Sequence, residues 1–121
     1  MYPYFPVATR GDTVFASGRS GGTVAILASS GATLWQQPAL DVVDALTPCG
    51  GRLIARTSIS LRVQVWILAS GDGRIIGGYQ LVDLWPVADP AADGGRAFIA
   101  TNKLLSGLGA ATLVALDCSK L

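Results

Sequence analysis

Few residues of this chain have the type and spacing that chemistry needs. Histidine is absent, so the usual general base near neutral pH and the commonest metal ligand are both missing. The acids are eight aspartates, and none has the spacing of an EF-hand calcium site. Two close pairs, Asp41 with Asp44 and Asp89 with Asp93, could act as acid and base on a glycoside, but only within a cleft. Aspartate commonly caps turns, so we expect loop-capping roles and no metal site.

The cysteines and glycines also lack the spacing of reactive sites. Cys49 and Cys118 are 69 residues apart, which excludes a CxxC redox site and a four-thiolate zinc site. No histidine is present to activate either thiol, so we expect both to be small buried residues. Glycine pairs occur at 21–22, 50–51, 77–78 and 94–95. They fit neither G-x-G-x-x-G nor the P-loop, and each lies beside an apolar segment, so they indicate turns.

Arginines and one tryptophan are the candidates for contact with a ligand or a partner. Arginine binds anionic groups through paired hydrogen bonds, and an exposed tryptophan offers a flat apolar surface. The alternatives are that the arginines are solvated or pair with a neighbouring aspartate, and that the tryptophan packs between sheets. The candidate binding residues are Arg52, Arg56, Arg62, Arg96 and Trp85. Arg52 and Arg96 occupy equivalent positions in two internal repeats, described below.

Composition limits the classes of partner that the chain could bind. It also indicates which secondary structure positions these residues. Nine basic and eight acidic residues give a net charge of +1, so no field favours nucleic acid or an anionic membrane. Half of the residues are hydrophobic and 14% are charged, as in a folded domain. The 15 glycines, 6 prolines and lack of glutamate favour strands and turns over helices.

The ends and the apolar runs bear on localisation. The first residues lack the basic and apolar regions of a signal peptide, and no apolar run is long enough to span a bilayer. The sequence ends in Ser119-Lys120-Leu121, which is a peroxisomal address if it is the true C-terminus of the protein. The alternatives are a chance match and a cut within a longer chain. Localisation is otherwise unknown from sequence.

Three internal repeats dominate the pattern. Segments 11–17, 51–57 and 95–101 each begin with glycine and continue as a short apolar strand, and their glycines are 40 and 44 residues apart. A second apolar strand follows each one, at 23–29, 63–70 and 112–117. A third strand follows a glycine turn at 33–36 and at 75–79, and has no counterpart in the last repeat. A proline-containing strand precedes each glycine, at 5–8, 45–48 and 85–88, and proline confines such strands to sheet edges.

This order of strands and turns resembles the blades of quinoprotein-like β-propellers. The stretches that match best are 21–35, 63–71 and the Leu-Val-Ala-Leu-Asp segment at 113–117. Trp35 stands at the family's blade-docking tryptophan, whereas the second repeat has Ile76 or Gly77 there. The resemblance implies an all-β fold of three four-stranded antiparallel blades, at about 1–40, 41–81 and 82–121, the last without its outer strand. The layout is similar to the C-terminal propeller of acyl-adenylating, β-alanine-activating enzymes.

The length leaves an alternative fold open. Propellers have four to eight blades, so three blades would be half or the C-terminal part of a ring. We therefore expect a second copy or another polypeptide to complete it. A β-trefoil also has three units of about forty residues, and it closes as a monomer. In a propeller, a disulfide between Cys49 and Cys118 would join two blades, and we expect none.

The function expected from these patterns is a non-catalytic scaffold that binds protein or supports assembly. The resemblance implies a pyrroloquinoline quinone and calcium site only where a tryptophan floor, acid and amide ligands and an adjacent cysteine pair surround the channel. This chain has one asparagine and distant cysteines, so we expect no cofactor. The alternatives are a propeller within an enzyme, either acyl-adenylating or quinone-dependent, and a carbohydrate-binding trefoil.

Overall fold

The structure, a computed structural model, describes residues 6–18, 21–40, 42–59, 62–82, 84–86, 91–93, 95–103 and 111–120. In these ranges the chain forms strands and one short 3₁₀ helix, as the composition predicts. The first group of strands is β1 (Val7–Arg10), β2 (Thr13–Ser17), β3 (Thr23–Leu27) and β4 (Thr33–Gln37). The second is β5 (Ala45–Cys49), β6 (Arg52–Ile59), β7 (Arg62–Ala69) and β8 (Ile75–Val82). The third is β9 (Leu84–Pro86), β10 (Ala91–Asp93), β11 (Arg96–Lys103) and β12 (Ala111–Asp117), followed by the 3₁₀ helix η1 (Cys118–Lys120).

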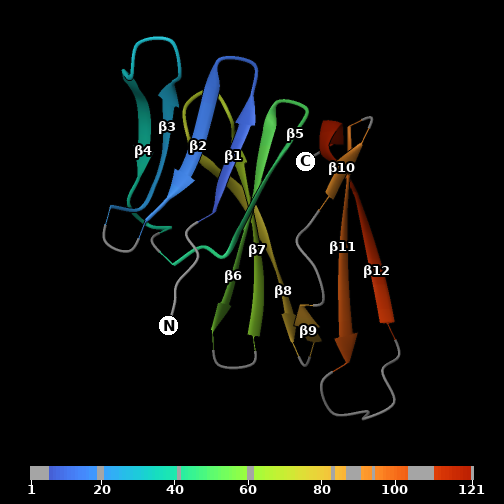
Figure 1. The fold of residues 1–121 in the computed structure, drawn as a ribbon. Helices are drawn as coiled ribbons and strands as arrows, with labels where there is room; N and C mark the ends of the chain where they lie inside the picture. The colour runs from blue at the N-terminus through green and yellow to red at the C-terminus, as the bar shows by residue number, and fades with distance from the viewer. Residues whose placement is uncertain are drawn as a thin grey trace.

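The strands make three separate antiparallel sheets. The first has the order β1-β2-β3-β4, the second β5-β6-β7-β8, and the third β10-β11-β12 with β9 also paired to β11. The sheets stand side by side, and β5 contacts both β1 and β10 (Figure 1). Each group of consecutive strands therefore forms one blade, with its first strand nearest the neighbouring sheets. This is a partial β-propeller, and the trefoil alternative does not describe it.

Tight hairpins join the strands at the positions that the glycines predict. Gly31 ends the β3–β4 turn and Gly73 ends the β7–β8 turn, both with φ of 76°. Residues with side chains rarely adopt this conformation, so glycine fixes these turns. Proline lies beside or within the edge strands, with Pro48 in β5 and Pro86 in β9. The prediction that proline marks edge strands is confirmed for these two.

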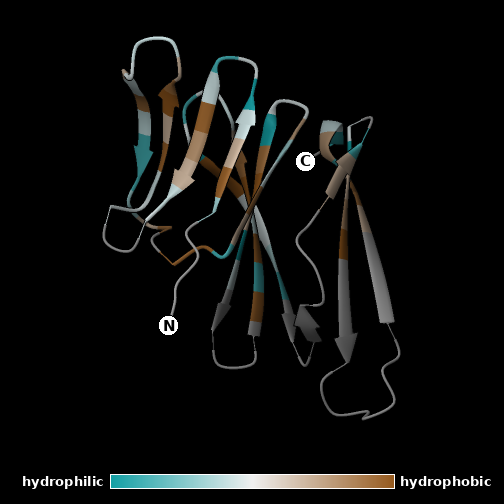
Figure 2. Ribbon diagram, in the orientation of Figure 1, coloured by the Kyte–Doolittle hydropathy of each residue, from teal (hydrophilic) through white to brown (hydrophobic). Residues whose placement is uncertain are grey.

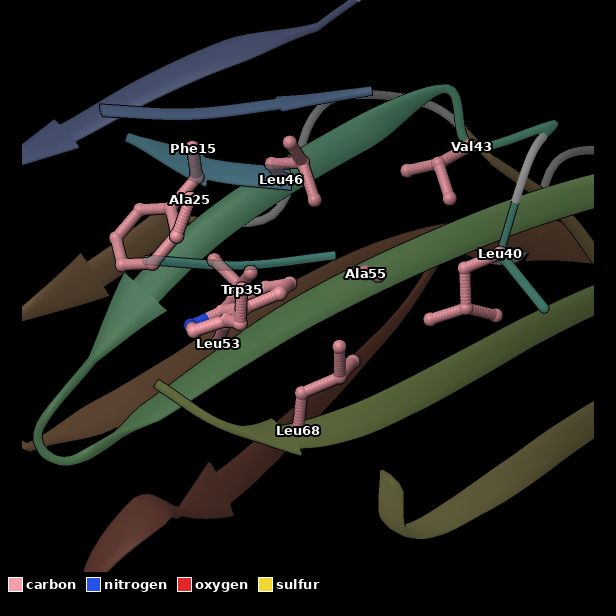
Figure 3. Close-up of a cluster of buried hydrophobic side chains, with 9 residues drawn as sticks. All are labelled: Phe15, Ala25, Trp35, Leu40, Val43, Leu46, Leu53, Ala55 and Leu68. Carbon is pink, nitrogen blue, oxygen red and sulfur yellow. The ribbon is translucent and has the colours of Figure 1, made fainter. Parts of the chain in front are cut away.

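Two buried clusters join the sheets in sequence. The first lies between the first and second sheets and contains Phe15, Ala25, Trp35, Leu40, Val43, Leu46, Leu53, Ala55 and Leu68 (Figure 3). The second lies between the second and third sheets and contains Cys49, Ile54, Val63, Val65, Ile67, Ala97, Ile99 and Cys118. Alternate residues of β6 and β7 enter opposite clusters, which explains why these strands are apolar on both faces. Figure 2 shows hydrophobic residues, in brown, along β2 and β3 of the first sheet.

The third sheet differs from the expected pattern at its inner edge. One continuous strand was expected at 85–88, but β9 and β10 pair with opposite ends of β11, at Thr101–Lys103 and Arg96–Phe98. The inner edge of this blade is therefore two short strands. Residues 87–90, which include Asp89, lie outside the described residues.

The prediction of no disulfide is wrong. Cys49 and Cys118 form one, with their Cα atoms 6.0 Å apart. Cys49 ends the inner strand β5, and Cys118 begins η1 immediately after β12 of the next sheet. From sequence, a bridge between two blades of a propeller is implausible. After β12, however, the Cys118 backbone N–H donates to the Gly95 carbonyl oxygen at 2.8 Å, and Cys118 and Cys49 share the second buried cluster, within the distance that one disulfide spans.

Candidate functional site

A pocket opens where the three inner strands end. It has a volume of about 290 Å³. Its walls are Thr9 and Arg10 from β1, Pro48, Cys49 and Gly50 from the end of β5, and Ala92, Asp93 and Gly95 from the end of β10. In a complete propeller the inner strands line a central channel, so the pocket lies at one end of the strands that would line it. We call it the channel pocket.

Three equivalent positions give the channel pocket its chemistry. Arg10, Cys49 and Asp93 each pair with the first residue of the following strand. The positions thus carry a cation, half of a disulfide and an anion. Both signs of charge are therefore present in the pocket. It offers no activated nucleophile, since both cysteines are in the disulfide.

Sequence reasoning missed this set, although a signal was available. Each of the three residues directly precedes a glycine: Arg10 before Gly11, Cys49 before Gly50, and Asp93 before Gly94. The repeat alignment on Gly11, Gly51 and Gly95 is one residue out of the strand register in the second and third repeats, so it sets Arg10 against Gly50 and Gly94. The search for clusters in the linear sequence could not bring them together.

Two of the predicted binding residues lie at the same end of their sheets as the channel pocket. Arg52 begins β6 and Arg96 begins β11, which confirms their equivalence. Arg96 is exposed, and Arg52 is partly buried, with its Nη1 donating to the Gly51 carbonyl oxygen at 3.4 Å. Acids accompany them, with Asp93 opposite Arg96 in the strand pair. The mixed charge gives this end no strong preference for an anion.

Arg56 is buried within the second sheet. Its Nε donates to Asp44 Oδ1 at 2.8 Å, and the Asp44 backbone N–H donates to the Arg56 carbonyl oxygen at 2.9 Å. The guanidinium is 7% exposed, whereas the aspartate is 42% exposed. This geometry matches the alternative that the arginine pairs with an aspartate. Binding of a partner by Arg56 stays a prediction.

The other two candidates lie toward the opposite end of the sheets. Arg62 begins β7 at the β6–β7 hairpin, and Trp85 pairs with Asn102 near the end of β11. Their side chains lie outside the described residues. The fold therefore does not gather the five predicted residues into one site.

Aspartates cap turns as the sequence predicts. Asp12 accepts hydrogen bonds from the Ser29 backbone N–H at 3.0 Å and the Ser29 hydroxyl at 2.6 Å. Asp72 accepts one from the Arg74 backbone N–H at 3.0 Å. Asp117 accepts two from Ser119, and these bonds hold the pKa of its carboxyl below the usual value. Asp41 lies outside the described residues.

Trp35 joins the first two sheets at their outer side. Its Nε1–H donates to the Ser70 carbonyl oxygen at 2.9 Å, and its ring lies over Gly73. A Cβ on Gly73 would fall 2.3 Å from a ring carbon, so only glycine fits beneath the indole. Gln37 Nε2 adds a bond to the Gly73 carbonyl oxygen at 3.0 Å. The prediction that Trp35 docks one blade on the next is confirmed.

Metal-ligating side chains do not form a cluster among the described residues. Across the described ranges, no three histidine, cysteine, aspartate or glutamate residues gather in one place. The donors that a calcium-bound quinone would need are therefore not assembled in these ranges, and we derive no chemistry through such a cofactor. In the same part of the chain, no helix is long and apolar enough to cross a membrane.

Comparisons with known proteins bear on the fold. No protein-family model matches the sequence, and no curated protein matches it. Among solved structures, the chain is similar to BamB from Moraxella catarrhalis, a PQQ-like β-propeller, with a TM-score of 0.63 and 18% sequence identity. The match covers 95% of this chain and 34% of that one. The chain thus spans about a third of the length of a propeller protein, and the likeness establishes the fold alone.

Proposed function

We propose that this chain is a non-catalytic propeller segment that acts as a protein-binding or assembly scaffold. A second copy or another polypeptide would complete its ring. The observation that carries the proposal is the outer face of the first sheet. The second sheet has a neighbour on each face, whereas the first sheet has a described neighbour on one face only.

The outer face of the first sheet is apolar. Residues of β2 and β3 alternate, so that Phe15 and Ala25 enter the first buried cluster while their neighbours point the other way. Val7 on this face is 65% exposed. The other apolar residues of the face are only partly buried, and neither buried cluster contains them: Val14, Ala16, Val24 and Ile26. We call these five residues the free face.

The free face has the composition of a blade interface. A contiguous apolar patch on a protein surface commonly marks a docking site. Each Å² of apolar surface removed from water contributes roughly 25 cal/mol, so covering such a face stabilises the ring. Two copies would give six blades, within the four to eight that propellers have. This count makes a second copy the simplest occupant.

The same proposal accounts for the channel pocket. A ring would enclose this pocket, and its arginine and aspartate would then face a shared channel. An enzyme that reacted within the pocket would need a reacting group there, and Cys49 is held in the disulfide, whereas a propeller appended to an acyl-adenylating enzyme would need none. The described residues of the pocket give no reason to prefer a propeller of an acyl-adenylating or quinone-dependent enzyme over a scaffold propeller.

The disulfide also bears on localisation. Disulfides persist in oxidising compartments and are rare where glutathione keeps thiols reduced. We therefore propose that the chain works in an oxidising compartment, in preference to the destination that Ser119-Lys120-Leu121 would give. Alkylation of thiols in freshly lysed source cells, followed by mass spectrometry, tests this. Unmodified, disulfide-linked Cys49 and Cys118 are expected, and two alkylated thiols would contradict it.

A charge on the free face tests the scaffold proposal. Val14→Asp places a carboxylate within the patch, whereas Ala39→Asp places the same charge on an exposed turn. Sedimentation velocity over a range of concentrations measures association. We expect Val14→Asp to weaken association at least tenfold and Ala39→Asp to leave it unchanged. Equal association by both variants would contradict a role for this face.

A further inference from the structure

At the junction between the second and third sheets, the position equivalent to Trp35 is not a tryptophan. In the first sheet Trp35 pairs with Ala25, and the strand register shifts between Ala25 and Ile26. In the second sheet Gly77 pairs with Ile67, and the register shifts between Ile67 and Leu68. The two irregularities coincide, so Gly77 is the counterpart of Trp35. Sequence had left this position between Ile76 and Gly77.

The side chain missing at Gly77 leaves a recess. Its volume is about 310 Å³, and it is lined by Ile67, Ile76, Gly77, Gly78, Tyr79 and Lys120. A Cβ built on Gly77 meets no atom within 4 Å. Ile67 belongs to the second buried cluster, as Ala25 belongs to the first, so the recess faces the third sheet. We call it the junction recess.

The acceptor that Trp35 uses also has a counterpart here. Ser70 follows β7 and donates its backbone N–H to the Gly51 carbonyl oxygen; Cys118 follows β12 and donates its backbone N–H to the Gly95 carbonyl oxygen. Cys118 therefore occupies in the third sheet the position that Ser70 occupies in the second. The carbonyl oxygen of Ser70 accepts the indole N–H of Trp35. The disulfide to Cys49 fixes Cys118, which is two residues before Lys120 of the junction recess.

We propose that the junction recess binds the indole ring of a tryptophan presented by a different polypeptide. The recess has apolar walls and lies at the position that an indole fills in the first sheet, and indole is a side chain with a large apolar surface and a single N–H donor. Lys120 and Tyr79 at its rim suit an aromatic ring through cation–π and edge contacts. β8 is the last strand of its sheet, so a partner segment can approach along its edge.

Two of the three tryptophans of this chain are already engaged within it, and the side chain of Trp85 lies outside the described residues. Trp35 is docked on the second sheet. Trp66 packs against the first buried cluster, and its Nε1–H donates to Thr57 Oγ1 at 3.2 Å. A second copy would have to break these contacts to supply either ring. The junction recess is lined by residues of a single chain, so its binding of an indole can be tested on the chain alone.

The chain itself supplies a suitable probe. Residues 32–38, Ala-Thr-Leu-Trp-Gln-Gln-Pro, contain the tryptophan that docks at the first junction. A synthetic peptide of this sequence with 5-fluorotryptophan can be titrated with the full chain by ¹⁹F NMR. We expect a saturable shift, with amide shifts at Gly77 and Gly78. The same peptide with alanine in place of tryptophan, observed through those amides, should bind at least tenfold more weakly.

Two variants of the recess and one control complete the test. Gly77→Trp fills the recess from within, and Ile76→Asp places a charge on its exposed wall. Both should reduce peptide binding at least tenfold, and Gly77→Trp should also raise the melting temperature. Leu34→Trp adds a tryptophan at an exposed position of the first sheet and should leave binding unchanged. If the wild-type chain gives no saturable shift, or if Ile76→Asp binds as well as wild type, the proposal is overturned.

Discussion

At the scale of single residues, Trp35 and Gly73 show how one contact joins two sheets. The indole covers the glycine, and the positive φ of that glycine shapes the turn beneath the ring. Gly31 has the same φ of 76° in the equivalent turn of the first sheet, but a Cβ there meets no atom within 4 Å. A substitution at Gly31 therefore measures the cost of the backbone conformation alone, whereas the same substitution at Gly73 adds the cost of a collision with the indole ring.

This pair gives a first prediction. Gly31→Ala should lower the free energy of unfolding by about 1 kcal/mol, because alanine is strained at positive φ. Gly73→Ala should cost about 1–3 kcal/mol more, because its methyl group collides with the indole ring. Urea unfolding of both variants measures the difference. Equal costs would show that the ring of Trp35 does not rest on Gly73.

A second prediction concerns Asp117. Hydrogen bonds from the Ser119 hydroxyl and backbone N–H lower its pKa from the usual value of 3.8. A carboxyl whose pKa is lowered by folding stabilises the fold above its unfolded pKa, and this stabilisation is lost as pH falls through the folded value. NMR titration should therefore give Asp117 a pKa below 3.8, and Ser119→Ala should raise it. A Ser119→Ala titration that matches wild type would contradict this cause.

The candidate binding residues mark the limit of sequence reasoning at this scale. Equivalent positions such as Arg52 and Arg96 could be predicted, because the repeats align them. The pairing of Arg56 with Asp44 could not, because it depends on a bend of the chain before β5 that no local pattern records. Channel residues likewise meet only when three blades are placed together.

At the scale of elements, the strands were predictable because local signals agreed. Apolar runs, glycine turns and edge prolines give the observed order of the first two sheets. The divided inner edge of the third sheet was not predicted, because Trp85 and Pro86 continue the apolar pattern of a single strand. The disulfide was missed because it links two elements whose separation in space depends on the packing of whole sheets.

The two junctions are joined by different means, and this leads to a third prediction. Trp35 joins the first pair of sheets, whereas the Cys49–Cys118 disulfide joins the second pair. The double variant Cys49→Ser/Cys118→Ser should lose about 2–4 kcal/mol of unfolding free energy, because the 69-residue separation constrains the unfolded chain. Urea unfolding with and without reductant measures it.

The reductant supplies the control for this prediction. Reduction should destabilise the wild-type chain to the level of the double variant and leave the double variant unchanged. Amide hydrogen exchange should locate the loss at Ile99 of the third sheet, with Phe15 of the first sheet less affected. Wild-type stability that is insensitive to reductant would contradict a structural role for the disulfide.

At the scale of the whole molecule, the chain forms three blades of a partial β-propeller. Its likeness to BamB covers about a third of that chain, and the free face of its first sheet has no described neighbour, whereas both faces of the second sheet are covered. A propeller is stable when each blade covers the next. As proposed above, a partner therefore covers the free face in the working protein.

The molar mass of the intact protein in solution tests this claim most directly. Size-exclusion chromatography with light scattering should give about 25 kDa, twice the 12.5 kDa of one chain, or a stoichiometric complex with a co-purifying polypeptide. Either result agrees with a ring completed between chains. A stable monomer of 12.5 kDa that stays folded on dilution would contradict it, because the free face would then be exposed to water without a partner.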